Sequence, residues 1–320
     1  MNHLFSDFYN KSQFKLKALP PHEPDIEEIR QKFEAWKLAF LAEEDARREA
    51  EMKLRVERSN QNGWRLMPHL PDPRSMELQR EDSIERRKKN DAEGPLAEAR
   101  AARNSDFFKT LSSACFIEGY TDYLVNRPLP EVVSRLRRGC DHAAQALEFG
   151  FTAHAWQIND YLHEAIAVDH FKLAQTVIRL RQSEWDTNRI RPVNWLITRI
   201  RIVMDLFLKK EADLQVLLEN ERKGLFEEKL PSELDPDLPE MRNFYELLRA
   251  LVEKKETAFN QALAARMPIR EAHFQRGGTV APIALLDVHG LALCRLARKR
   301  GLKPQASHVY LPLEILDLEN

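Results

Sequence analysis

Residues 279–316, TVAPIALLDVHGLALCRLARKRGLKPQASHVYLPLEIL, decide the fold. Pro282 suits the first turn of a helix, where its missing N–H is not needed, and Gly301 is a natural residue to follow the last turn. Basic residues gather in the last turns, where cations interact favourably with the helix dipole. Apolar residues surround most of the circumference of this predicted helix, residues 282–300. It should therefore be central and covered on several sides.

Gly290 stands inside this apolar helix. A glycine in a helix interior costs about 1 kcal/mol relative to alanine. A neighbouring helix that crosses closely at this point would explain it, because only glycine leaves room for such an approach.

The chain from Ser105 onward repeats the helical pattern. Apolar residues recur at helical spacing in 105–124, 131–149, 152–164, 168–181, 192–209, 211–221 and 241–266. Only 10 glycines and 31% charged residues favour long solvated helices, and no strand pattern is found in the sequence. We predict an all-α fold, an irregular multi-helix array of antiparallel helical hairpins around a central apolar C-terminal helix.

Composition divides the chain into three predicted parts. Residues 1–58 form an N-terminal helical arm, residues 59–104 a polar, charged insertion or linker, and residues 105–320 the helical core domain with a C-terminal Tyr-Leu-Pro tail. We expect 59–104 to be a mobile surface insertion. Its basic run Arg86–Lys89 is flanked by acids, which favours a solvated face over contact with nucleic acid.

Length and charge exclude several classes of protein. A chain of 320 residues can bury a sizeable core. The net charge of −1 provides no field that calls for nucleic acid or a membrane surface. No stretch reaches the roughly 20 apolar residues of a membrane span, and the first residues lack the apolar core of a signal peptide. Three widely spaced cysteines are typical of reduced core thiols, so we expect a cytoplasmic protein.

Residue types that bind metals gather only in one place. They are His154, Asp160, His163, Glu164, Asp169 and His170. His163 and His170 would share a helix face only in an unbroken helix, and a metal would need further ligands from another helix. A metal-dependent helical hydrolase is one hypothesis for this cluster, and partly exposed structural residues are the favoured interpretation.

Nucleophilic catalysis has no better support in the sequence. Cys140 precedes Asp141 and His142, but successive residues on a helix point about 100° apart and cannot form a relay. The pair Ser307–His308 lacks an identifiable partner that would orient the histidine. Neither a glycine-rich phosphate loop nor a Cys-x-x-Cys or His-Glu-x-x-His motif occurs. We therefore predict that the protein is not an enzyme and that it uses no cofactor or metal.

A binding role is favoured by the proline-broken segment 225–240. It carries six acids against the single Lys229: Glu227, Glu228, Glu233, Asp235, Asp237 and Glu240. Its prolines oppose regular structure, and its charge would attract a basic partner and raise the rate of association. The alternative is a solvated loop between two helices.

The end of the chain resembles the C-terminal signature of the immunity protein 49 family of bacterial polymorphic toxin systems. In that family an apolar helix, a charged-Gly turn and a Ser-x-x-Tyr-Leu-Pro-x-x-Leu-Leu-like tail close the chain. The matching residues here are Leu291-Ala292-Leu293, Leu296-Ala297, Arg300-Gly301, Ser307-His308-Val309-Tyr310-Leu311-Pro312 and Ile315-Leu316. Residues 120–270 match only as a general run of helices, and residues 1–100 show no match.

This resemblance implies a cytoplasmic, non-catalytic immunity protein whose partner is a cognate toxin. Many such toxins act on nucleic acids through basic clefts, so the acidic segment 225–240 would occlude such a cleft. The long arm and the insertion at 59–104 depart from the family pattern and leave open which surface contacts the toxin. The alternative function, from another class, is a helical-repeat adaptor that binds a peptide or regulatory protein in a concave groove.

Overall fold

The computed structural model describes residues 34, 35, 37, 39, 42, 43, 46, 50, 53, 54, 57, 63, 73–180, 194–227, 238–277, 286–306 and 308–318. The chain divides into two compact units, Met1–Glu57 and Arg58–Asn320. Every described residue of the first unit is helical. All helices from α3 onward belong to the second unit.

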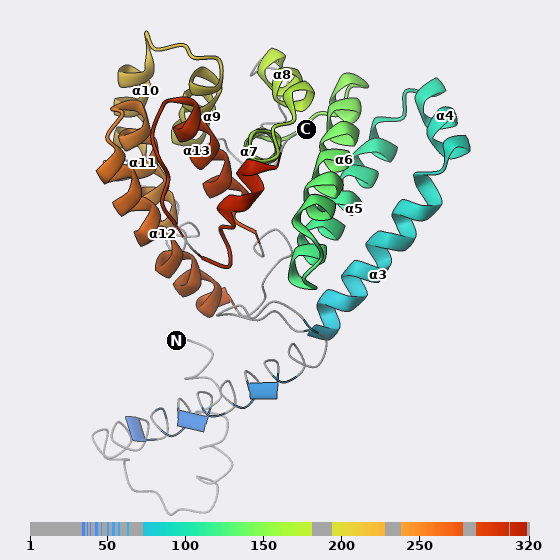
Figure 1. Cartoon of the computed structure of the whole chain (residues 1–320), viewed down its shortest axis with the longest axis horizontal. Helices are drawn as coiled ribbons and strands as arrows, with labels where there is room; N and C mark the ends of the chain where they lie inside the picture. The colour runs from blue at the N-terminus through green and yellow to red at the C-terminus, as the bar shows by residue number, and fades with distance from the viewer. Residues whose placement is uncertain are drawn as a thin grey trace, which may run out of the picture. The chain divides into compact units, whose positions relative to one another are not determined.

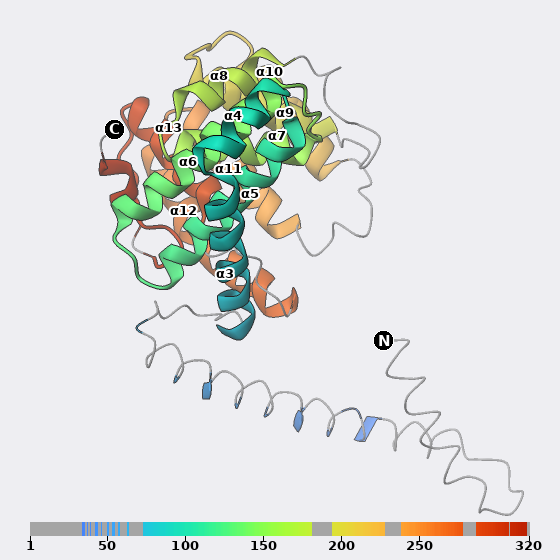
Figure 2. The same cartoon turned by 90° about the vertical axis from the view of Figure 1, so that its right-hand side faces the viewer.

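The second unit is built from helices, which confirms the predicted all-α fold (Figure 1, Figure 2). In chain order they are α3 (Pro73–Asn90), α4 (Glu93–Ala101), α5 (Ser105–Leu124), α6 (Leu129–Glu148), α7 (Ala155–Ala167), α8 (Phe171–Arg179), α9 (Asn194–Phe207), α10 (Leu214–Phe226), α11 (Leu238–Val252), α12 (Glu256–Gly277), α13 (Val288–Lys299) and the 3-10 helix η4 (Leu313–Asp317). The described residues contain no strand, and a single β-bridge joins His308 to Leu311.

Helices that follow one another pack as hairpins. α5 packs on α6, α9 on α10 and α11 on α12, and α7 contacts α8 (Figure 1). Residues 125–128 connect the first of these pairs, and residues 253–255 connect α11 to α12. Connections this short join neighbouring helices in antiparallel orientation. The hairpin array predicted from the sequence is therefore present.

The apolar C-terminal helix is central, as predicted. α13 packs against α7, α11 and η4, and every residue from Leu291 to Ala297 is buried. The predicted start at Pro282 is wrong, because Leu286 and Asp287 are not helical and α13 begins at Val288. The carboxylate of Asp287 caps the helix by accepting a hydrogen bond from the N–H of Gly290. Pro282 itself lies outside the described residues.

The tail after α13 fixes the start of the same helix. Gly301 has a φ of +84°, a left-handed conformation that glycine adopts without strain. The chain then turns back toward the start of α13. There the backbone carbonyl of the fully buried Tyr310 accepts a hydrogen bond of 2.7 Å from the N–H of Asp287. The hydroxyl of Tyr123 on α5 donates to the carbonyl of Val309. The tail is thus a structural element of the core.

The tail and the N-cap residue limit the space at Gly290, where the sequence had suggested the close crossing of a neighbouring helix. A Cβ at position 290 would lie 2.4 Å from Oδ2 of Asp287 and 2.9 Å from Cδ1 of Leu311. The N-cap carboxylate and a leucine of the tail occupy the space that a side chain would need.

Helix α3 lies in the region that composition assigned to a mobile surface insertion. Arg80 donates to Asp122 of α5 over 2.7 Å, and Arg87 donates to Glu118 of α5 over 3.1 Å. Both carboxylates are almost completely buried. The basic run is therefore divided: Arg86 is exposed and pairs with Asp82 on its own helix, whereas Arg87 is fixed to the core.

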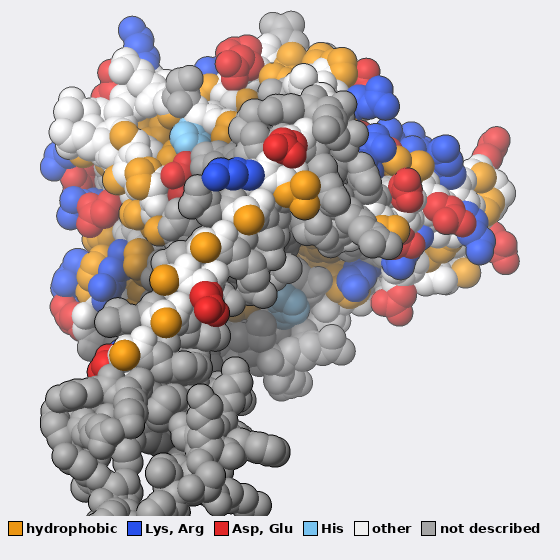
Figure 3. Space-filling view, turned by 90° about the horizontal axis from the view of Figure 1, so that it is seen from below, with side chains coloured by type: hydrophobic (Ala, Val, Ile, Leu, Met, Phe, Trp, Pro, Cys, Tyr) orange, Lys and Arg blue, Asp and Glu red, His pale blue; other side chains and the backbone are white. Residues whose placement is uncertain are grey.

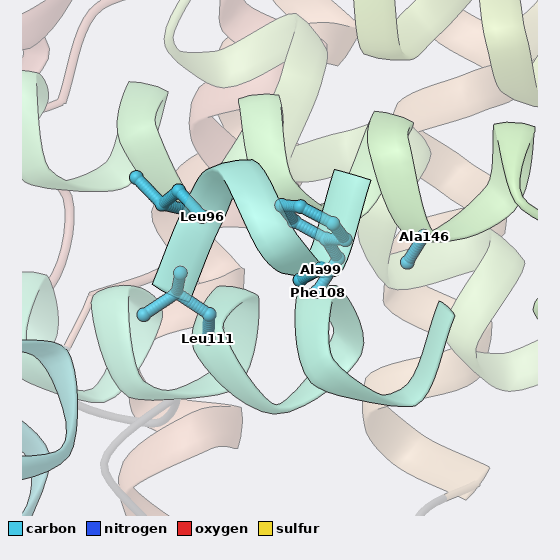
Figure 4. Close-up of a cluster of buried hydrophobic side chains, with 5 residues drawn as sticks. All are labelled: Leu96, Ala99, Phe108, Leu111 and Ala146. Atoms are coloured by element: carbon cyan, nitrogen blue, oxygen red, sulfur yellow. The ribbon is translucent and has the colours of Figure 1, made fainter. Parts of the chain in front are cut away.

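Helix α4 adds apolar contacts between the same region and the core. Figure 4 shows the buried cluster, which consists of Leu96, Ala99, Phe108, Leu111 and Ala146. Phe107, Phe149 and Phe151 pack against it. The helices of 73–101 are thus packed on α5 and α6, while the predicted domain boundaries at 58 and 104 stay predictions.

The surface carries charges of both signs. Figure 3 shows Lys and Arg side chains interspersed with Asp and Glu side chains on one face, which agrees with the net charge of −1. Among the helices that the structure describes, none is long and apolar enough to cross a membrane.

Candidate partner-binding surface

The structure describes two of the six acids predicted to contact a partner. Glu227 directly follows α10, and its side chain is 54% exposed. Its carboxylate accepts a hydrogen bond of 2.7 Å from Arg222, which also binds Glu219. The other four acids lie outside the described residues: Glu228, Glu233, Asp235 and Asp237. Glu227 therefore marks the exposed start of the acidic segment.

Glu240, the sixth acid, is engaged inside the protein. It lies in the first turn of α11, and its side chain is only 22% exposed. Its Oε1 accepts hydrogen bonds from Arg270 over 2.6 Å and from Arg266 over 3.2 Å, both on α12. Glu240 thus holds α11 to α12, and Glu227 and Glu240 have different roles despite similar sequence surroundings.

Glu240 belongs to a buried network of four charges. Arg266 donates two hydrogen bonds to Asp287, over 2.5 and 2.8 Å, and both side chains are 1% exposed. Arg270 lies 3.4 Å from the same carboxylate. We call Glu240, Arg266, Arg270 and Asp287 the buried charge network. It joins α11 and α12 to the N-cap of α13.

The network keeps both of its acids ionised. Burial alone would raise the pKa of Asp287, but Arg266 and Arg270 hold that pKa well below its usual range. Burial would likewise raise the pKa of Glu240, and Arg270 and Arg266 lower it. Two acids facing two guanidinium groups leave the network electrically balanced.

A second buried ion pair lies between α9 and α10. Arg199 donates to Glu221 over 2.8 Å and to the carbonyl of Met241 over 2.8 Å. Its guanidinium lies 4.7 Å from the ring centroid of Trp195 and 4.5 Å from that of Phe244. Burial raises the pKa of Glu221, and Arg199 opposes that shift. The pair fastens α9 and α10 to the start of α11.

The six candidate metal ligands have separate structural partners. His154 and His170 cap α7 and α8, each accepting a backbone N–H with its Nδ1 atom. His163 is buried with Nδ1 2.7 Å from the carbonyl oxygen of Asn159, and Glu164 accepts from the hydroxyl of Tyr120 over 2.5 Å. The remaining two acids, Asp160 and Asp169, pair with His289 and Lys299. In the described ranges no three or more His, Cys, Asp and Glu are grouped to hold a metal.

The neighbours of Cys140 also separate. Asp141 lies 3.0 Å from Nε2 of His170, and His142 points toward Asp91 instead. The thiol of Cys140 is completely buried, and burial raises its pKa well above the usual value. A protonated thiol is a poor nucleophile. All three cysteines are buried free thiols, as the sequence indicated.

Sequence reasoning missed Arg266, Arg270 and Asp287. A signal was present, because Phe259, Leu263, Arg266 and Arg270 follow one another at intervals of four, three and four residues. That spacing places both arginines on the buried face of α12. A charged residue in such a position requires a buried partner of opposite charge. The partners, however, lie on other helices.

These features define the class: an all-α protein of helical hairpins whose buried charges pair with one another. Residues 122–315, more than half of the chain, match the family model described as Immunity protein 49. The chain belongs to the immunity protein 49 family, as the tail signature indicated, and the family implies the role of an immunity protein. No match is found among curated proteins or among solved structures.

Proposed function

We propose that this protein neutralises a cognate toxin in the cytoplasm by binding it, and that it carries out no chemistry itself. Membership of the immunity protein 49 family supports this proposal. The state of the nucleophiles also supports it. Burial raises the pKa of the Cys115 thiol to about 12 and that of Cys294 further, so both thiols are protonated at neutral pH.

The proposed contact is the acidic segment that begins at Glu227 and continues to Asp237. The observation that carries this choice is the exposure of Glu227, which presents its carboxylate at the end of α10. Acids at an exposed position steer a basic partner and raise the association rate. A basic cleft on the toxin, of the kind that binds nucleic acid, would be occluded by this segment. Glu240 is not part of the proposed contact, because the buried charge network holds it.

The test starts from co-expression with the adjacent open reading frame, followed by pull-down. The affinity of the captured toxin is then measured for a variant that carries E227K, E228K, E233K, D235K and D237K. We expect at least a tenfold loss of affinity, mainly through slower association, and a weaker dependence on salt. A matched control reverses two exposed acids of α3, E81K and E85K, and should leave toxin binding unchanged.

Two results would contradict this proposal at different levels. Unchanged affinity and salt dependence in the acidic-segment variant would reject the contact surface but keep toxin binding. Failure to capture the toxin, together with specific capture of a peptide or a regulatory protein, would replace the immunity function with that of an adaptor.

A further inference from the structure

A polar cavity of about 930 Å³ lies where the C-terminal end of α3, α4, α6 and the first turn of α8 meet. Five cationic side chains line it: Arg100, Arg135, Arg137, Arg138 and Lys172. Two carboxylates, Asp91 and Asp141, also line it. We call this hollow the basic cavity. Its volume falls within the roughly 300–1,000 Å³ range of small-molecule sites in proteins.

Both carboxylates of the basic cavity already have cationic or hydrogen-bonding partners. Asp91 lies 2.6 Å from Arg138, and Asp141 lies 3.0 Å from His170. Two carboxylates against five cations still leave positive charge in excess in the lining.

Two of the other cations have acidic partners outside the lining. Lys172 is 3.5 Å from Glu148. Arg135 lies 2.9 Å from Glu118 and 4.0 Å from Asp122, but Arg87 binds the first of these carboxylates and Arg80 the second. Two acids thus face three guanidinium groups there. Positive charge remains in excess around the basic cavity.

Arg137 supplies a positioned donor. Its Nε donates over 2.9 Å to the carbonyl of Val168, the residue that caps the C-terminal end of α7. This bond holds the planar guanidinium in place. Its Nη2 is buried and has no hydrogen-bond partner within the described residues. Arg137 also lines the basic cavity, and a guanidinium fixed in this way is suited to bind an anion there.

Arg100 of α4 supplies a second cation. It lies in the last turn of α4, is exposed, and lines the same cavity. Among the described residues, no acid pairs with the side chain of Arg100. It is therefore available to a ligand.

His142 adds a buried polar group to the wall of the cavity. Its side chain is only 7% exposed, and its Nε2 lies 3.5 Å from Oδ1 of Asp91. Neither atom makes a hydrogen bond with any described residue. Burial lowers the pKa of His142, although Asp91 opposes this shift, so the ring adds no positive charge to the cavity at neutral pH.

We propose that the basic cavity binds the phosphate group of a phosphorylated small molecule, with Arg137 and Arg100 as the charged donors. Guanidinium groups match the geometry of phosphate oxygens, and the cavity has room for the rest of a small ligand. The inference rests on α4, α6 and α7 and does not depend on the acidic segment or on toxin binding. An acidic segment of a protein is the competing occupant, but a hollow of about 930 Å³ favours a small ligand.

The test is calorimetric titration of the full chain with inorganic phosphate, pyrophosphate and ADP at constant ionic strength set with chloride. We expect saturable binding of pyrophosphate or ADP. R137Q and R100Q should each weaken it about tenfold, because each removes a charge-assisted hydrogen bond. R86Q is the matched control, since Arg86 is exposed and pairs with Asp82 on α3.

Three results would overturn the proposal. They are the absence of saturable binding of any probe to the folded chain, binding that R137Q and R100Q leave unchanged, and weakened toxin binding in these variants without anion binding. Because Arg100 is exposed, the R100Q variant should fold normally. The test therefore remains valid even if the R137Q variant does not fold. Urea unfolding of every variant separates lost binding from lost stability.

Discussion

Arginines on helices serve two different ends in this protein, and the buried charge network and the basic cavity show the difference. In the network, Arg266 and Arg270 face Asp287 and Glu240, so each cation has an acid. In the cavity, Nη2 of Arg137 has no partner within the described residues, and the acids present are bound to other groups. Matched charges fix the packing of helices, whereas unmatched charges beside a hollow are available to a ligand.

The same contrast separates the two described acids of the predicted contact segment. Glu240 is inside the network, and Glu227 is on the surface. Residue type and local charge density were similar, so pairing across helices decides the role. Four predictions test this comparison, in order from the largest expected effect to the smallest.

Asp287→Asn should be the most damaging change. Asparagine is a good helix cap, so the variant removes the charge but keeps the N-cap interaction with Gly290. It leaves the buried Arg266 with only Glu240, which lies 3.2 Å away and is shared with Arg270, and breaking a buried ion pair typically costs about 3–5 kcal/mol. Urea unfolding measures the loss in the free energy of unfolding. The double variant D287N/R266M should lose less than the sum of D287N and R266M. A loss below about 1 kcal/mol would show that the network does not stabilise the fold.

Glu240→Gln and Glu227→Gln compare the two acids directly. E240Q should lower the free energy of unfolding by about 1–3 kcal/mol, because it removes the carboxylate to which Arg266 and Arg270 donate. E227Q should leave stability unchanged, because Glu227 is largely exposed. Thermal or urea unfolding of both variants gives the result. Equal effects would remove the distinction between them.

Gly290→Ala tests how closely the tail and the N-cap of α13 surround the network. The added Cβ would meet Asp287 and Leu311 at less than 3 Å. Overpacking of this kind costs about 1–3 kcal/mol. The higher helix propensity of alanine offsets about 1 kcal/mol of this cost. Urea unfolding should show a net loss. Gly94→Ala in α4 is the matched control, because nothing lies within 4 Å of a Cβ there, and it should be neutral or slightly stabilising.

Two buried histidines, His163 on α7 and His142 in the wall of the basic cavity, predict how stability changes with pH. Burial, with the neighbouring His289 next, lowers the pKa of His163 well below its usual value. Burial also lowers that of His142 in the basic cavity, where Asp91 opposes the shift. Below about pH 6.5 the unfolded chain binds protons that these folded histidines do not. Their contribution to stability is therefore present above pH 6.5 and lost as the pH falls.

The expected loss is up to about 1.4 kcal/mol per pH unit for each histidine. Unfolding measured between pH 7 and pH 5 should show a weaker pH dependence in H163Q than in the unchanged chain. H142Q should show a smaller difference than H163Q. An H163Q variant with the full pH dependence would mean that His163 is protonated in the folded state.

How far the sequence predicts this protein differs between its fold and its site. The apolar run of α13, the glycine at its end and the Tyr-Leu-Pro tail predicted a central helix and the family. The start of α13 was misplaced, because the N-cap depends on Asp287 and Tyr310, which meet only when the tail returns. The basic cavity had no sequence signal, since Arg100 lies on α4, Arg137 and His142 lie on α6, and the three residues carry no motif.

The sequence by itself determined the helices, their hairpin order and the family, because apolar periodicity and capping residues act within a few positions along the chain. Tertiary structure alone decided which charges are internal and which are available. Arg266 finds Asp287 at a separation of 21 residues and Glu240 at a separation of 26. Coulomb attraction between buried groups depends on their distance in space and on the loss of water around them. The local sequence determines neither quantity.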